Sequence, residues 1–250
     1  MGQQKGPLRL RGTHGDFTFA ETKDGYVWRK KAIVDKNRLA LKTMERVRNN
    51  IAEFSTAGRA VKLIREAFKT QISIAKDRHL TPRLQVAVVK VVQGDTVHPH
   101  GLRTAATGDP ALLEQFQCNP KALFSTVLGT DHSSSIDRAT GNAILTVPPF
   151  IPDNCLVKPD GSTHFRISAS CSEIDFENNS FETKMEQTAL LPIDRLATAA
   201  IVLTNTMTPG STLPVFLAAG IQFSQVVNGF ETPIVGGDSC ALCFVKVDNP

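Results

Sequence analysis

The feature that most constrains the fold is a change in the spacing of apolar residues about halfway along the chain. From Asp35 onward, apolar side chains recur every three or four residues, the period of an amphipathic helix. Beyond residue 120 the chain consists of short β runs separated by turn sequences such as Thr140-Gly141-Asn142 and Asn228-Gly229. At 250 residues and 41% hydrophobic content, the chain can bury a sizeable core. We therefore expect an α+β fold in which an N-terminal β-hairpin and amphipathic helices precede an antiparallel β-sandwich or barrel.

A hairpin is predicted near the N-terminus. Side-chain polarity alternates with a period of two in Asp16–Thr22 and in Tyr26–Lys30. Between these runs lies Lys23-Asp24-Gly25, and Gly accepts the positive φ of a tight turn. The residues before the hairpin are basic and rich in glycine, so they offer little apolar surface that could order them. Residues 1–34 are thus expected to form an N-terminal arm and hairpin.

A basic helical region is expected over residues 35–118. Two apolar stripes, one on each side of Gly58, predict two helices, and Thr81-Pro82 predicts the start of a third, with Thr as N-cap and Pro at the first helical position. The run Val86–Val92 is rich in β-branched residues, so a strand is the alternative prediction there. Gly108-Asp109-Pro110 predicts a short helical turn. The stripes are Leu41, Met44, Val47, Ile51 and Phe54, then Ala57, Ala60, Val61, Ile64, Ala67 and Phe68.

An acidic β-rich domain is expected over residues 119–250. Seven runs of apolar and β-branched residues, separated by turn residues, are typical of an antiparallel sandwich or barrel. The runs are Leu123–Leu128, Ala143–Val147, His164–Cys171, Thr183–Leu191, Ala199–Thr204, Val215–Val227 and Ala241–Val247.

Charge is distributed unevenly along the chain. Through Arg103 there are 21 Lys and Arg against 9 Asp and Glu, and the remainder has 7 against 15. Such asymmetry favours either binding of a polyanion or attraction between neighbouring copies, although helices rich in Lys and Arg can also simply have solvated faces.

No catalytic residue, metal site or cofactor site is predicted, so we expect the protein not to be an enzyme. Asp238-Ser239-Cys240 resembles a serine-protease nucleophile loop, but no sequence context supplies its His and carboxylate. Cys240 and Cys243 form C-x-x-C, yet three steps along a strand point the two thiols to opposite faces, which favours core packing. His98 and His100 lack the further ligands of a structural zinc site.

The sequence favours synthesis in the cytoplasm, with a place in a released particle or filament left open. Five cysteines, an odd number scattered along the chain, do not resemble a disulfide scaffold. No apolar stretch has the length of a signal peptide or of a membrane span, so no membrane partner is expected.

Several stretches resemble a family of Bacteroidota proteins of unknown function, and the likeness covers nearly the whole chain. It implies that the helical and β-rich parts occur together as one unit, and it implies no ligand, activity or site residue. The stretches are Lys5-Gly6-Pro7, residues 21–26, 49–54 and 57–65, Thr163–Ile167 and Glu173–Phe176.

These observations lead us to expect a non-enzymatic structural subunit that assembles with copies of itself into a filament, tube or virion-like particle. The expected contacts are in the arm and hairpin, because an arm with alternating Leu and Arg can add as a strand to an exposed sheet edge. A nucleic-acid-associated protein that uses the basic half, and a sandwich that binds a ligand or carbohydrate, remain alternatives. The expected contact residues are Leu8, Arg9, Leu10, Arg11, Tyr26 and Trp28.

Overall fold

The computed structural model describes residues 2–6, 8–22, 25–31, 36–75, 77–234 and 240–250. The chain divides into an N-terminal part, residues 1–48, and a body, residues 49–250. In the described part of the chain, none of the helices combines the length and apolarity that a bilayer crossing demands.

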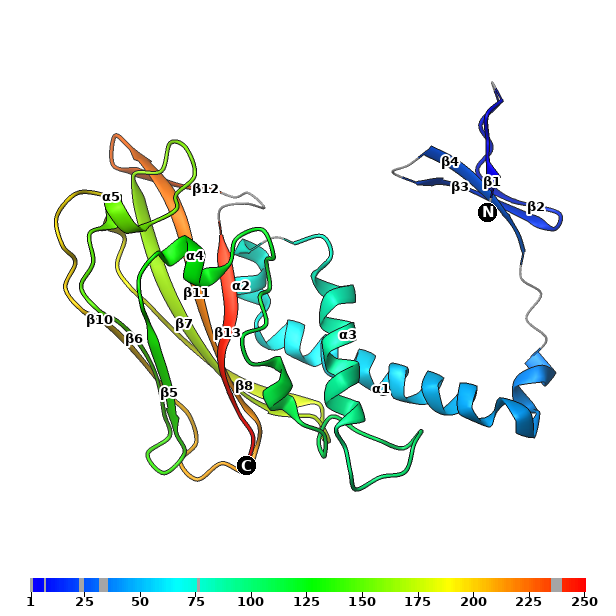
Figure 1. The fold of residues 1–250 in the computed structure, drawn as a ribbon. Coiled ribbons are helices and arrows are strands. Elements are labelled where there is room, and N and C mark those ends of the chain that lie inside the picture. The colour runs from blue at the N-terminus through cyan, green and yellow to red at the C-terminus, as the bar shows by residue number, and fades with distance from the viewer. Residues whose placement is uncertain (1, 7, 23–24, 32–35, 76, 235–239) are drawn as a thin grey trace. The chain divides into compact units, whose positions relative to one another are not determined.

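The N-terminal part contains a four-stranded antiparallel sheet in the order β1-β4-β3-β2 (Figure 1). The predicted hairpin lies at its centre, because β3 and β4 pair from Phe17 opposite Lys30 to Thr22 opposite Gly25; turn residues 23–24 lie outside the described residues. No described residue of this sheet is buried. The elements are β1 Gly2–Gln3, β2 Gly12–His14, β3 Phe17–Thr22 and β4 Gly25–Lys30, then the 3-10 helices η1 Lys36–Ala40 and η2 Lys42–Met44.

One helix, α1 (Glu45–Ala67), runs through Gly58, so the prediction of two separate helices on either side of this residue is wrong. A glycine inside a helix costs only about 1 kcal/mol relative to alanine, and packing of the adjacent turns outweighs that cost. Ala57 and Ala60, which flank Gly58, are both buried. A short helix, α2 (Lys69–Ile74), follows.

The third helix, α3 (Leu80–Gln93), confirms the helical prediction and excludes a strand over Val86–Val92. It begins before Thr81, so the prediction that Thr81 is the N-cap is wrong. Instead His79 occupies the N-cap position, and its backbone N–H donates to the Asp77 carboxylate at 2.9 Å.

Strand β11 is the centre of a six-stranded antiparallel sheet. One of its edges pairs with β7, and the other pairs first with β13 and then with β12. The β11–β12 hairpin turns at Asn228 and Gly229, whose φ values of 52° and 81° fit the left-handed turn that the Asn-Gly pair predicts. The strands are β7 His164–Asp175, β8 Ser180–Gln187, β9 Leu191–Pro192, β11 Val215–Val227, β12 Phe230–Ile234 and β13 Ala241–Asp248.

A second antiparallel sheet has three strands in the order β10-β6-β5. Its central strand β6 alternates half-buried and buried residues, as a strand with one face on a core does. The strands are β5 Ser133–Asp137, β6 Asn142–Val147 and β10 Ile201–Thr206.

The predicted strand over Leu123–Leu128 is wrong, because Phe124–Leu128 forms the short helix α4. Phe124, Val127 and Leu128 are buried at a spacing of three and four residues, which places them on one helical face. Gly129 ends the helix with φ 61°, in the left-handed region. The predicted turn after Asp109 is present as η3 (Pro110–Leu113), and α5 comprises Pro152–Cys155.

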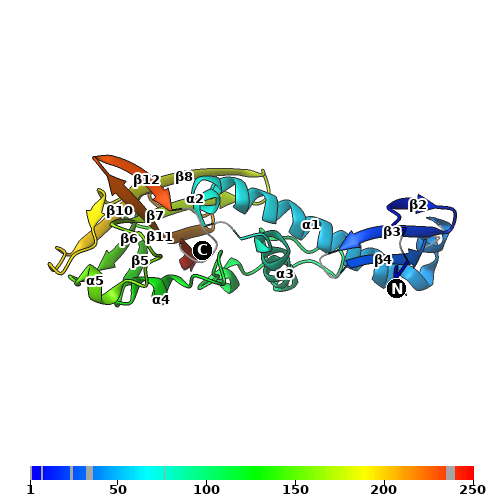
Figure 2. The same ribbon diagram turned by 90° about the horizontal axis from the view of Figure 1, so that it is seen from above.

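Two cores lie on opposite faces of the large sheet (Figures 1 and 2). The first lies between the two sheets and contains Leu145 and Leu217. The second lies between the large sheet and α1 to α3, and contains Leu84, Phe216 and Phe244. The fold is therefore α+β, an N-terminal hairpin and helices combined with an antiparallel sandwich, as predicted.

Candidate assembly surfaces

Three of the predicted contact residues come together on the N-terminal sheet. The guanidinium carbon atoms of Arg9 and Arg11 lie 5.0 Å and 5.7 Å from the centre of the Tyr26 ring, within the range of cation–π attraction. Arg11 also donates to the Tyr26 hydroxyl at 3.2 Å and forms an ion pair with Glu21. The arm is thus attached to the hairpin by its basic side chains.

Trp28 lies on the same face of the hairpin as Tyr26, because side chains two positions apart along a strand share a face. Its ring meets that of Phe17 edge-on at 5.3 Å, and it pairs across the strands with Phe19. Phe17 and Trp28 remain 39% and 38% exposed. Within the described residues of the N-terminal part, this aromatic face is not covered by a second layer.

Leu8 and Leu10 lie on the surface, with 80% and 42% of their area exposed. The backbone of Leu10 is held by Gln4, whose side-chain amide accepts from the Leu10 N–H at 2.9 Å and donates to its carbonyl at 3.2 Å. The two apolar side chains that the arm was expected to offer are therefore available.

The N-terminal half of α1 has an exposed apolar face that the sequence analysis did not single out as a contact surface. Ile51 and Phe54 lie three residues apart on one helical face and are 53% and 60% exposed. We call these two residues the α1 stripe. The C-terminal half of the helix, in contrast, buries Val61 and Ile64 in the core.

A buried carboxylate fixes the helix beside the stripe. Glu53 is 4% exposed and accepts the backbone N–H of Gly101 at 2.8 Å. Arg103 and His100 each approach it at 3.8 Å, and His100 also hydrogen-bonds Asn50 at 2.9 Å. The stripe thus belongs to a helix held by side-chain contacts.

Asp95 organises the loop that holds α1. Burial alone would raise the pKa of this carboxyl, but hydrogen bonds from the Thr107 hydroxyl, from the Thr104 N–H and from His98 outweigh burial, and the pKa lies well below its ordinary value. The Nδ1 atom of His98 lies 2.8 Å from Asp95. His98 and His100 therefore bind different partners, and the described residues contain no cluster of three or more His, Cys, Asp or Glu placed to hold a metal.

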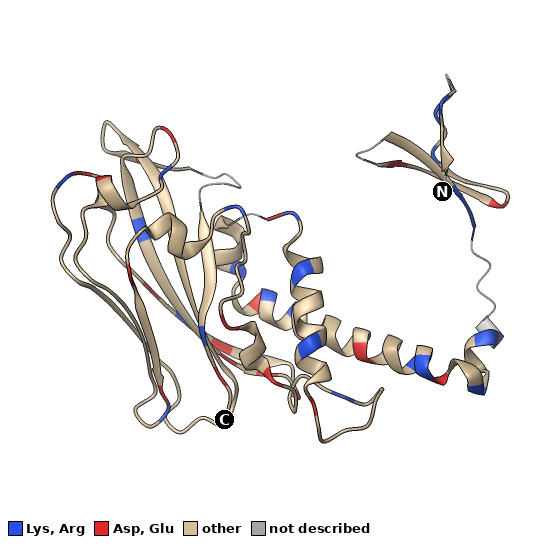
Figure 3. Ribbon diagram, in the orientation of Figure 1, with Lys and Arg blue, Asp and Glu red and all other residues tan. Residues whose placement is uncertain are grey.

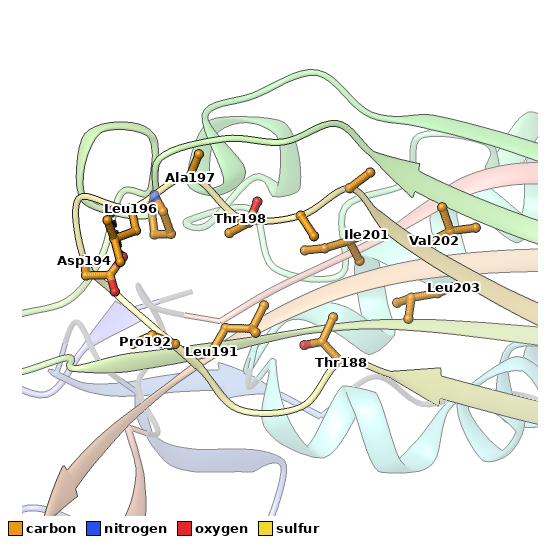
Figure 4. Close-up of a pocket in the computed structure, with 13 residues that line it drawn as sticks. Thr188, Leu191, Pro192, Asp194, Leu196, Ala197, Thr198, Ile201, Val202 and Leu203 are labelled. Carbon is orange, nitrogen blue, oxygen red and sulfur yellow. Dashed lines mark hydrogen bonds between the residues drawn. The ribbon is translucent and has the colours of Figure 1, made fainter.

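A pocket of about 510 Å³ lies along strand β10 (Figure 4). One wall is formed by the segment from Asp194 to Leu203, and the other by Thr188, Leu191 and Pro192. Ile201 and Leu203, which also line it, belong to the core between the sheets. The lining includes no Lys, Arg or aromatic residue, and Asp194 is its only charged group. No motif in the sequence indicates this pocket.

The charge asymmetry is retained in the two parts. Residues 1–48 have 12 Lys and Arg against 5 Asp and Glu, and residues 49–250 have 16 against 19. Figure 3 shows Lys and Arg along α1 and α3. Glu182 and Glu186 are exposed on β8, a strand that pairs only with β7 among the described strands, and Glu182 forms an ion pair with Lys184 at 2.8 Å.

The nucleophile-like sequence is only partly described, since Asp238 and Ser239 lie outside the described residues. In the described part of the chain, no disulfide joins any two of the five cysteines. Comparison with known proteins finds no matching family model, no similar curated protein and no similar solved structure. The resemblance to Bacteroidota proteins stays a prediction.

Proposed function

We propose that this protein is a non-enzymatic structural subunit that assembles with copies of itself into a filament, tube or particle. The observation that carries the proposal is the α1 stripe. Complete burial of an Ile or Phe side chain contributes about 1.5–3 kcal/mol, and here Ile51 and Phe54 remain more than half exposed on one face. Exposed apolar groups that adjoin one another are typical of interaction surfaces.

The N-terminal sheet supports the same function. None of its described residues is buried, and Phe17 and Trp28 on its aromatic face are 39% and 38% exposed. Small sheets of this kind gain stability when another layer covers them. A neighbouring copy can supply that layer.

Charge favours a copy of the same chain as the partner. The N-terminal part has an excess of seven positive charges, and the body has an excess of three negative charges. Contact between the basic part of one copy and an acidic surface of the next uses different surfaces on the two copies, and such a heterologous contact produces rings or open filaments.

Binding of nucleic acid is the second candidate, and the stacking of Arg9 and Arg11 on Tyr26 favours it. Basic side chains next to an aromatic ring combine phosphate contacts with base stacking. Affinity of this kind falls steeply with salt because counterions are released on binding. Assembly through apolar side chains should instead persist at high salt.

The proposal is tested by light scattering coupled to size-exclusion chromatography, followed by negative-stain microscopy, after nuclease treatment. The full chain is expected to form multimers, and I51E/F54E is expected to be monomeric. Ser55→Glu is the matched control, because it adds charge at an exposed position beside the stripe. All variants should unfold within about 2 °C of one another, since surface substitutions change stability little. A full chain that is monomeric at every concentration, or a double variant that assembles normally, would contradict the proposal.

A further inference from the structure

The two sheets of the sandwich approach one another at one end of β10 and separate at the other. Near the end of β10, the Asn205 side chain donates to the Ala169 carbonyl on β7 at 3.4 Å. Toward its start, the strand runs along the pocket, opposite Thr188 and Leu191 (Figure 4). The pocket is thus a slot at the side of the sandwich, where a further strand would close it.

The edge of β10 that faces the slot is open. Ile201 to Thr206 pair with β6, and within the described residues no backbone hydrogen bond joins the other edge of β10 to another strand. An open edge of this kind is a template for an added strand. Leu191, Ile201 and Leu203 provide an apolar surface next to it.

We propose that the slot binds residues Leu8 to Arg11 from a second copy of this chain as an added strand on β10. This inference rests on the proposed function and names one contact of the assembly. Four extended residues span about 13 Å, a length comparable with the edge from Ala200 to Leu203. The occupant places Leu8 and Leu10 on one side, toward the slot, and Arg9 and Arg11 on the other.

Exposure and charge argue for this occupant. Leu8 is 80% exposed, the largest value among the exposed large hydrophobic residues of the described chain. Residues 5–11 contain three basic residues and no acidic one. Asp194 is the one charged residue among those that line the slot, and the adjacent Arg195 forms an ion pair with Asp153 at 3.3 Å. Glu186 lies exposed on β8, two residues before Thr188.

Cysteine cross-linking between two variants tests the contact. Leu10→Cys and Ala200→Cys are each made in a Cys155→Ala background, because Cys155 is the one natural cysteine that is not fully buried. After mixing and mild oxidation, we expect a reducible band at twice the 27.2 kDa mass of the chain. Since each chain has one added cysteine, the mixed product forms only between copies; homodimers of each variant alone are measured and subtracted.

The control pairs Leu10→Cys with Lys62→Cys, whose exposed position on α1 is outside the slot. A second pair, Leu8→Cys with Thr188→Cys, probes the other wall, so an unfavourable geometry in one pair does not decide the result. Multimers by light scattering with no cross-linking above the control in either pair would overturn the docking site and leave assembly standing. A chain that is monomeric at every concentration would overturn both.

Discussion

Cys240 and Cys243 are three residues apart and face opposite sides of the large sheet. Cys240 packs with Phe244 and the helices, and Cys243 packs in the core between the sheets. The arrangement predicted from strand geometry is therefore confirmed. Burial raises the pKa of the Cys243 thiol to about 12, although the hydrogen bond from Gln117 acts in the opposite direction. The pair cannot close a disulfide without rearrangement of β13.

This arrangement predicts the order of thiol labelling. Iodoacetamide added to the native protein at pH 8 should modify Cys155 first, because the other four cysteines are buried. Burial likewise raises the pKa of Cys171 to about 12, so little thiolate is present there. Mass spectrometry after digestion measures the labelling of each site, and urea should expose the remaining thiols. Fast labelling of Cys240 or Cys243 in the native state would contradict the assignment.

Two glycines with the same backbone conformation should respond differently to alanine. Gly129 and Gly210 have φ 61° and 70°, so each variant carries the strain of a left-handed residue, about 1–2 kcal/mol. A Cβ at Gly129 would lie 1.9 Å from the Cys155 carbonyl oxygen, whereas a Cβ at Gly210 meets nothing within 4 Å. Urea unfolding should show Gly129→Ala to be clearly less stable than Gly210→Ala. Equal losses would contradict the packing around α4.

The Asp95 carboxylate predicts a pH-dependent contribution to stability. Its pKa is lower in the folded chain than the value of about 3.9 expected in the unfolded chain, so ionisation stabilises the fold. This stabilisation is complete above the unfolded pKa and is lost as pH falls toward the folded pKa. Asp95→Asn should therefore cost about 1.5–3 kcal/mol near pH 7, the range for hydrogen bonds to a charged group.

Urea titrations between pH 2.5 and 8 measure this difference. The difference in free energy of unfolding between the natural chain and Asp95→Asn should be constant from pH 5 to 8 and should become smaller below pH 4. Asp109→Asn is the control, because Asn can still accept the Ala111 N–H at the start of η3. A difference that is independent of pH to the lowest value measured would refute the role given to ionised Asp95.

Substitutions in the arm should separate the apolar from the electrostatic contribution to assembly. If Leu8 and Leu10 enter the slot, L8S/L10S should prevent assembly at both 50 mM and 500 mM salt. R9Q/R11Q should weaken assembly mainly at low salt, because exposed charges are screened as ionic strength rises. Sedimentation velocity gives both results. The opposite pattern, with the arginine variant defective at all salt concentrations, would favour nucleic acid or another polyanion as the partner.

Strong periodic patterns made much of the fold predictable. Val215–Val227 was predicted as a strand with its observed bounds, because its apolar and β-branched residues are bounded by turn signals. Ser133–Asp137 was not recognised as a strand, because three serines give no apolar alternation; its pairing with β6 supplies the stabilisation. The helix at Phe124–Leu128 was missed because a short apolar run fits both periods.

The candidate surfaces were predictable only in part. Alternation identified Leu8 and Leu10, but helical spacing alone could not tell whether Ile51 and Phe54 are buried, because a stripe indicates which face is apolar and not what covers it. The slot depends on the distance between β10 and Thr188, which tertiary packing determines.

The cores of the body also have a consequence for synthesis on the ribosome. The ring of Phe68, which follows α1, packs 5.1 Å from that of Phe244 on β13, and Phe216 on β11 lies beside Phe244 at 5.8 Å. The helices emerge from the ribosome long before these strands do, so their apolar faces stay uncovered while most of the chain is being translated. At about 5–20 residues per second, this interval lasts roughly 9–35 s for the 176 residues from Lys69 to Phe244. Nascent chains of this protein should therefore depend on chaperones that shield helices until translation is nearly complete.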